Sequence, residues 1–476
     1  MRKIAVLVSM LLAVAASAKV TLPEIISDNM VLQRNSDVTL WGKADPGAVV
    51  KVTLGWDGTI SKAKAGKDGR WSLTVKTTEA GGPYDIIFSD GTDVKVSNVM
   101  LGEVWFCGGQ SNMVMPMDGF RSQPVEGAVD YIVKAKASRP IRVCNIKRKT
   151  SLEPLGSART SWQLNTPENV AKASATAYFF AEYLNEVLDV PVGVITSAWG
   201  GSTIEAWMSR EVLEKFPEVN LPDMNGTIPE KSPQQVPTVL FNGMVSPIVP
   251  YTVKGFLLYQ GEANKGSSEL YGRLLPAYVE MMRNLWGNDA LPFYYVQVAP
   301  FKYSGRSNYE GAMIREAQLK ALDKIPHSGM VVTHDIGDEF CVHPAKKAQV
   351  GQRLALLALS KDYGLKGFDA ESPVYKSMKV EGDEVTVTFK VSGKGVGPKG
   401  AALTGFEVAG EDRVFHPASA KVKSVSELVV KSKHVSAPVA VRYGFHNAGD
   451  PATVFNSMGI PASPFRTDDW EVKETK

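Results

Sequence analysis

Ser111 and His343 are the two residues whose types and surroundings best suit acyl transfer. A serine hydroxyl becomes a nucleophile when a base removes its proton, and histidine is the usual base. His343 follows an acid-rich segment that contains Asp335, Asp338 and Glu339. Any of these carboxylates is close enough in sequence to bond the second ring nitrogen and orient the base. Alone, the serine of a Gly-x-Ser sequence is more often a turn or helix-cap residue.

A second group of residues has the chemistry to stabilise a developing oxyanion. Gly200 and Gly201 can bring backbone N–H groups close to a substrate, and the side chains of Gln260 and Asn264 offer neutral amide donors. Gln110, next to Ser111, belongs with this group. The alternative is that the glycines form a tight turn and the amides a loop network.

The elements that must position these residues alternate between strand and helix from about residue 100 to 365. Apolar runs predict strands at residues 104–106, 192–195, 255–259, 293–297 and 330–333. Helical patterns occupy residues 175–188, 270–286, 312–322 and 344–362. This alternation indicates an α/β domain with a mainly parallel sheet. Ligands of such sheets bind at the carboxyl ends of the strands, which is where the candidate residues lie.

The flanking regions have the short alternating strands of all-β structure. Such strands are predicted at residues 38–41, 50–54, 71–75, 385–389, 428–430 and 439–441. Residues 112–170 and 216–250 have a weaker pattern and are expected to form long loops with short pieces of structure. We therefore divide the chain into a β-sandwich module at 19–100, a catalytic domain at 101–366 and a β-rich module at 367–476.

The first 18 residues have the layout of a secretory signal peptide. A basic start (Met1-Arg2-Lys3) precedes a short apolar run, and the small residues Ala16-Ser17-Ala18 form a cleavage signature. We therefore expect export, with the periplasm as the destination. No other stretch is long and apolar enough to span a bilayer.

Charge and cysteine content exclude several other classes. The chain has 53 basic and 50 acidic residues, and no basic block indicates a nucleic-acid surface. The three cysteines, Cys107, Cys144 and Cys341, are too few for a disulfide framework, and we expect buried free thiols. No Cys/His cluster has zinc-site spacing, so neither metal nor cofactor is expected.

Several motifs, taken together, resemble the sialate O-acetylesterase family of the SGNH hydrolase superfamily. Residues 102–113 (GEVWFCGGQSNM) are similar to its GEVWxCxGQSNM block, and residues 199–207 to WGGTxIEAW. Residues 259–264 (YQGEAN) resemble YQGExN, and residues 342–355 resemble IHPxxKxxVGxRLA. Residues 27–34 and 459–468 resemble the family's beginning and end. The resemblance thus covers nearly the whole mature chain in ordered blocks.

The resemblance implies both a fold and an activity. The fold would be an SGNH-type three-layer α/β/α domain with a parallel sheet, flanked by β-rich modules. The activity would be hydrolysis of O-acetyl groups on sialic acids, or on other acetylated glycans such as xylan. It implies Ser111 as nucleophile and His343 as base. The Ser111 N–H would form the oxyanion hole with Gly201 and with Gln260 or Asn264.

One position departs from the superfamily pattern. The acid usually stands three residues before the histidine, where this chain has Phe340. The orienting acid must then be Asp338, Asp335 or Glu339, unless a carbonyl takes its place, and we favour Asp338 with Asp335 next.

Two other classes of function remain open from the sequence. Glu262 with Asp335 or Asp338 would suit a glycoside hydrolase, although nothing in the sequence gives the pair a distance. The β modules and nine tryptophans would also suit a non-catalytic glycan-binding protein.

Overall fold

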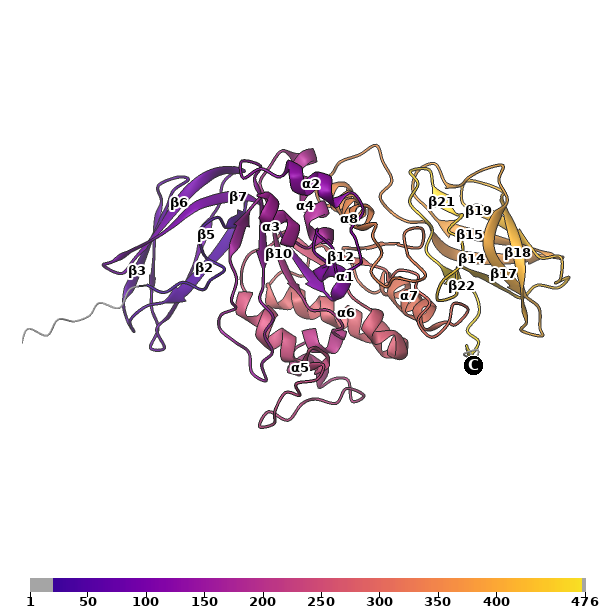
Figure 1. Cartoon of the computed structure of the whole chain (residues 1–476), viewed down its shortest axis with the longest axis horizontal. Coiled ribbons are helices and arrows are strands. Elements are labelled where there is room, and N and C mark those ends of the chain that lie inside the picture. Colours follow the sequence, from indigo (N-terminus) through magenta and orange to yellow (C-terminus); the bar gives the residue numbers. More distant parts are fainter. Residues whose placement is uncertain (1–19, 473–476) are drawn as a thin grey trace, which may run out of the picture.

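The computed structural model describes residues 20–472, so the predicted signal peptide lies outside the described residues. Three parts follow one another along the long axis of the molecule (Figure 1). A β module comes first, an α/β domain lies in the middle, and a second β module carries the C-terminus. This order agrees with the regions predicted from the sequence.

The middle domain is built on a sheet whose neighbouring strands are parallel, except for the last pair. The strand order is β13-β12-β11-β7-β10-β8-β9. In that order the strands span Ser328–Val331, Phe293–Val296, Gly255–Tyr259, Asp93–Gly109, Val192–Ala198, Ile141–Asn145 and Trp162–Leu164.

Helices cover both faces of this sheet. Trp105 and Cys107 of β7 join the core with α4 (Ala175–Leu188) and α8 (Lys347–Lys361). Val104 and Phe106 point the other way and join the core with α6 (Ser268–Leu285) and α7 (Glu310–Ala321). Because successive strand residues face opposite sides, a run that is apolar throughout is buried on both faces. The three-layer α/β/α prediction is confirmed.

Most predicted elements are present, with two kinds of difference. The stretches predicted as loops contain β8, β9 and several short helices. These are α1 (Ser111–Val114), α2 (Ala128–Lys134), α3 (Pro167–Lys172), η2 (Pro233–Gln235), η3 (Phe241–Val245) and η4 (Ser246–Ile248). Helix α8 begins at Lys347 rather than at 344, and the Pro344 carbonyl accepts from the side chain of Lys347, the helix's own first residue.

Strand β7 joins the first β module to the middle domain without a linker. Its first part pairs with β6 (Gly81–Ser89) and β1 (Val31–Gln33), and from Glu103 onward it pairs with β10 and β11. The boundary expected at residue 100 therefore falls inside one continuous strand. The module is completed by β3 (Val49–Leu54), β4 (Ile60–Lys64), β2 (Asp37–Lys43) and β5 (Arg70–Lys76).

The second β module is an antiparallel sheet with its own apolar core. Its strand order is β14-β15-β19-β18-β17-β20-β22. In that order the strands span Val374–Glu381, Glu384–Lys390, Glu427–Lys431, Phe415–Val422, Leu403–Ala409, Ala440–Tyr443 and Phe465–Arg466. A separate pair consists of β16 (Val396–Gly397) and β21 (Phe455–Asn456).

Asn447 of this module is inserted into the loop before α7. It has no exposed surface, and its side chain accepts from the Gly311 N–H at 2.7 Å and donates to the Gly305 carbonyl at 2.9 Å. The same loop is hydrogen-bonded to the acid-rich segment before His343, because the Lys302 N–H donates to the Glu339 carbonyl at 3.2 Å. The second β module thus supports a loop that borders the candidate site.

Two further observations concern membrane-spanning helices and the cysteines. Within residues 20–472, no helix combines the length and apolar character needed to cross a membrane. Cys107, Cys144 and Cys341 are free, as predicted, but Cys341 is only partly buried.

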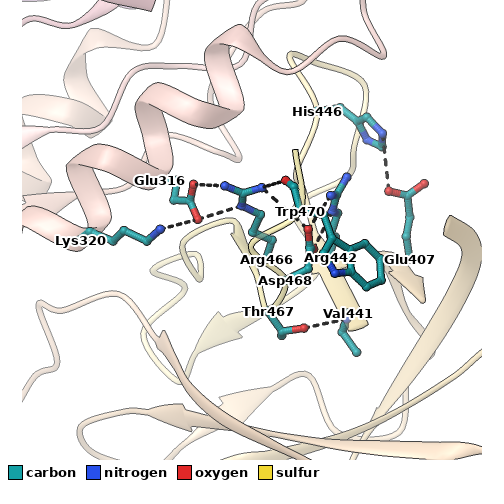
Figure 2. Close-up of polar contacts among 10 residues, drawn as sticks. All are labelled: Glu316, Lys320, Glu407, Val441, Arg442, His446, Arg466, Thr467, Asp468 and Trp470. Atoms are coloured by element: carbon teal, nitrogen blue, oxygen red, sulfur yellow. Dashed lines mark hydrogen bonds and ion pairs between the residues drawn. The ribbon is translucent and has the colours of Figure 1, made fainter. Parts of the chain in front are cut away.

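Ion pairs connect the second β module to α7 (Figure 2). The Nε and Nη2 atoms of Arg466 donate to the two carboxylate oxygens of Glu316 in α7, each at 3.0 Å. Arg466 and Glu316 are only 8% and 10% exposed, whereas Lys320, which also pairs with Glu316, is 66% exposed. Nearby, Arg442 donates to Asp468 at 2.7 and 2.9 Å.

Arg466→Met should destabilise the protein far more than Lys320→Met. Removing one partner of a buried pair leaves an uncompensated charge and costs about 3–5 kcal/mol. An exposed pair contributes about 0–1 kcal/mol. Thermal unfolding of the two variants beside the parent protein measures the difference, and equal shifts in midpoint would contradict the prediction.

Candidate active site

Ser111 lies at the carboxyl edge of the central sheet, at the first residue of α1. The chain reaches it through Gly109, whose φ is +143° and whose Cα packs so closely on β11 that a Cβ would lie 2.2 Å from the Tyr259 carbonyl oxygen. The Gln110 N–H donates to that same carbonyl at 3.0 Å. A side chain at position 109 would therefore push Ser111 away from the sheet. The serine itself is half-buried.

The glycine pair that follows β10 (Val192–Ala198) lies against Ser111. The Trp199 N–H donates to the Gly109 carbonyl at 3.1 Å, which ties the two strand ends together. A Cβ added to Gly200 would be 3.4 Å from the Cβ of Ser111, and Gly201 has a φ of +74°. As the first helical residue, Ser111 also has an N–H with no acceptor inside its own helix. Gly200 of the predicted glycine pair thus lies beside Ser111.

The predicted amide donors have a different environment. Gln260 is 1% exposed, and its Nε2 donates to Asn264 Oδ1 at 2.8 Å and to the Ser202 carbonyl at 3.2 Å. Asn264 Nδ2 donates to the carboxylate of Glu205 at 2.9 Å. These N–H groups already have acceptors within the protein and hold the loop after β11, and the oxyanion role of Gln260 and Asn264 stays a prediction.

Gln110 belongs to the same buried network. Its Oε1 accepts from Gly261 N, at 3.4 Å, and from Ala263 N, at 3.3 Å. It therefore links the segment before Ser111 to η5 (Glu262–Ser267), and the amide network that the sequence left as an alternative is the arrangement observed.

The ring of His343 is held by a loop that the sequence did not single out. Its Nδ1 lies 2.7 Å from Oε1 of Gln123, and the ring of Phe120 packs edge-on at a centroid distance of 5.1 Å. Phe120 and Gln123 are themselves joined by two backbone hydrogen bonds of 3.0 Å. An amide oxygen only accepts, so Nδ1 carries the proton and Nε2 is left as the basic nitrogen. Gln123 takes the place expected for a carboxylate.

The two acids predicted to orient His343 contact other groups in this structure. Asp338 accepts from the Phe340 N–H at 2.8 Å and the Cys341 N–H at 3.1 Å, closing a local turn. Asp335 forms a two-pronged ion pair with Arg353 of α8, at 2.8 and 2.5 Å. That buried guanidinium needs a counter-charge, which Asp335 supplies.

The remaining acids near His343 in sequence, or in the motif after β11, also have polar partners. Glu339 lies 3.6 Å from Arg306. Glu262 is buried, and its Oε1 accepts from Asn112 Nδ2 at 2.6 Å. Asp335 and Asp338 are hydrogen-bonded to other groups as well, so each carboxylate considered for a glycoside hydrolase has a partner of its own.

Burial and a nearby cation keep the imidazole neutral. Partial burial, with the positive charge of Lys347 as a second cause, lowers the pKa of His343 to about 4. Burial also lowers the pKa of Lys347 to about 7, although the carboxylate of Glu262 opposes this change. A neutral imidazole at neutral pH is the form that can accept a proton. Within residues 20–472, no three His, Cys, Asp or Glu side chains are grouped so as to hold a metal ion.

Sequence reasoning missed Gln123 because it lies in a segment without periodic pattern, 220 residues from the histidine it contacts. Lys347 and Asn112 were seen only as members of motifs. Their burial, 1% and 0% exposed, is a property of the packed structure and has no local signal.

Comparison with known proteins covers the whole site. Residues 101–360 match the family model described as carbohydrate esterase, sialic acid-specific acetylesterase. The chain is 29% identical to sialate O-acetylesterase of Mus musculus over 413 residues, which are 75% of this chain and 76% of that protein. The Homo sapiens sialate O-acetylesterase is also 29% identical, over 75% of this chain and 73% of that protein. The crystal structure of a novel carbohydrate acetylesterase from Xanthomonas citri has a TM-score of 0.86 at 34% identity, covering 95% of this chain and all of that one.

Gln123→Ala should lower kcat/KM for p-nitrophenyl acetate by about 100-fold, because a base that is free to rotate is misplaced by an ångström or so. Gln163→Ala, which removes an amide on the edge strand β9, should leave kcat/KM unchanged. Asp338→Ala should cost less than Gln123→Ala. The reverse order, measured with purified variants, would return the orienting role to Asp338.

Proposed function

Because the chain belongs to the sialic acid-specific acetylesterase family of carbohydrate esterases, we propose that it removes O-acetyl groups from sialic acids with Ser111 as nucleophile. The family assignment makes the chain an ester hydrolase. The observation that carries the roles is the placement of Ser111 against Gly200, at the edge of the sheet where His343 is held neutral with its Nε2 free.

The first half of the reaction transfers the acetyl group to the enzyme. Ser111 Oγ attacks the acetyl carbonyl carbon while His343 Nε2 takes the hydroxyl proton. The negative charge that develops on the carbonyl oxygen is held by the N–H groups of Ser111 and Gly201, with Gly200 alongside. The carbon–oxygen bond to the sugar then breaks, and the imidazolium returns its proton to the leaving sugar oxygen.

The second half regenerates the serine. A water molecule gives a proton to His343 Nε2 and attacks the acetyl-Ser111 carbonyl. Collapse of that intermediate releases acetate, and the proton returns to Ser111 Oγ. Throughout, Gln123 accepts from Nδ1–H, so it fixes the tautomer and stabilises the imidazolium without taking a proton.

A second substrate class is favoured by one observation. The Xanthomonas citri relative is more similar in sequence than the sialate O-acetylesterases named above, and it is described only as a carbohydrate acetylesterase. The same catalytic residues would deacetylate other acetylated glycans, such as xylan, since the proposed chemistry involves only the acetyl ester.

Acetate release from the two substrate classes tests the proposal. The mature protein should release acetate from O-acetylated sialic acid, and Ser111→Ala should lower the rate by at least about 10³-fold, as loss of a serine nucleophile does. Circular dichroism should show that Ser111→Ala remains folded. Turnover retained by Ser111→Ala would contradict the role of Ser111. Acetate from xylan alone would assign the second substrate class.

We also propose that the enzyme works in the periplasm, on the evidence of the signal-like residues 1–18. Expression of the full chain in a Gram-negative host should yield a periplasmic protein that begins at Lys19, as determined by mass spectrometry of the intact protein. A cytoplasmic protein that still begins with Met1 would contradict export.

A further inference from the structure

The backbone on both sides of His343 is held by two buried side chains from different elements. Asn112 Nδ2, from α1, donates to the carbonyl of Val342 at 3.0 Å. Lys347 Nζ, from the start of α8, donates to the carbonyl of Pro344 at 2.9 Å. The two side chains are also joined to each other, because Lys347 Nζ donates to Asn112 Oδ1 at 2.6 Å. Side-chain hydrogen bonds therefore hold the backbone carbonyls of the residues before and after His343.

Glu262 completes this arrangement by fixing the Asn112 amide. Its Oε1 accepts from Asn112 Nδ2 at 2.6 Å, so the amide nitrogen faces two oxygens and the amide oxygen faces an ammonium group. A flipped amide would reverse every one of these contacts. Asn112, Lys347 and Glu262 are 0%, 1% and 7% exposed. Burying a lysine and a glutamate costs free energy unless they compensate each other.

We propose that Asn112, Lys347 and Glu262 are positioning residues. They hold the His343 backbone at a fixed position relative to Ser111 and keep the imidazole uncharged. The proposal rests on the proposed function, because it assigns these residues a task in the same reaction. Asn112 directly follows Ser111, so its bond to Val342 makes the nucleophile's helix and the histidine's loop one rigid unit. The positive charge of Lys347 makes a second positive charge on the imidazole unfavourable.

The other groups around the ring cannot supply this charge effect. Phe120 and Gln123, from the loop packed on the imidazole, are not ionisable. On the histidine's own loop, Cys341 directs its thiol to the His343 carbonyl at 3.3 Å. Lys347 remains protonated in the range where His343 titrates, since its pKa is about 7 and that of His343 is about 4.

The test is the pH profile of Lys347→Met, measured on the mature protein with p-nitrophenyl acetate. Removing the charge allows the imidazolium to form more easily, so the pKa of His343 rises. The acid limb of kcat/KM should therefore move upward from about pH 4 toward the ordinary histidine value of about 6.5. Loss of the Lys347 hydrogen bonds to Pro344 and Asn112 should also lower kcat about 10- to 100-fold, with KM within about 2-fold.

Arg353→Met is the matched control, because it also removes a buried cation from α8. Arg353 donates to the Val332 carbonyl and to Asp335, and it does not contact the peptide groups beside His343. Arg353→Met should lose stability while its acid limb stays in place. The number of active sites in each preparation is counted by labelling Ser111 with a serine-reactive phosphonate, so that a loss of folded protein is separated from a loss of kcat.

Glu262→Gln provides a second variant in case Lys347→Met does not fold. It removes the charge but keeps an amide oxygen to accept from Asn112, so it should lower kcat less than Asn112→Asp does. Asn112→Asp replaces the donor by an oxygen and should lose at least about 100-fold. An acid limb and a kcat per labelled serine that are unchanged in Lys347→Met would overturn the proposal, as would equal kcat values for Glu262→Gln and Asn112→Asp. Turnover that persists in Ser111→Ala would instead refute the proposed function.

Discussion

Strand β7 is paired on both edges along its last residues, to β10 on one side and β11 on the other, and this constraint determines the position of the site. A strand that is hydrogen-bonded on both edges and packed on both faces cannot shift or twist away. Its chain can leave the sheet only through a residue that tolerates close backbone contact, which is Gly109. Ser111 follows two residues later, so the sheet itself fixes the proposed nucleophile.

The Nδ1 atom of His343 contacts a neutral amide oxygen, that of Gln123, rather than a carboxylate. A carboxylate on Nδ1 would raise the pKa of the imidazole, whereas an amide oxygen orients the ring without adding a charge. With burial and Lys347 acting in the same direction, the imidazole stays unprotonated well below neutral pH. The nearby acids serve other purposes: Asp338 closes a turn, and Asp335 neutralises Arg353.

The two β modules are connected to the site in different ways. The first shares β7 with the catalytic sheet, so the strand that ends at the nucleophile also belongs to that module's sheet (Figure 1). The second module contacts the catalytic domain through Arg466 and Glu316 and through Asn447. Asn447 holds the loop before α7, which in turn bonds to the acid-rich segment. Both modules therefore support the loops around Ser111 and His343.

The sequence alone indicated the α/β domain and most of its strands and helices, because apolar periodicity is a local feature. It offered Ser111 and His343 as candidates, and the family resemblance implied their roles. It could not identify what contacts His343. Gln123 lies 220 residues away in a segment without pattern, and only the packed structure brings it to the ring. Nor could the sequence identify the partners of Gln260 and Asn264: an amide has the same chemistry whether it faces a substrate or a neighbouring carbonyl, and tertiary packing decides which it meets.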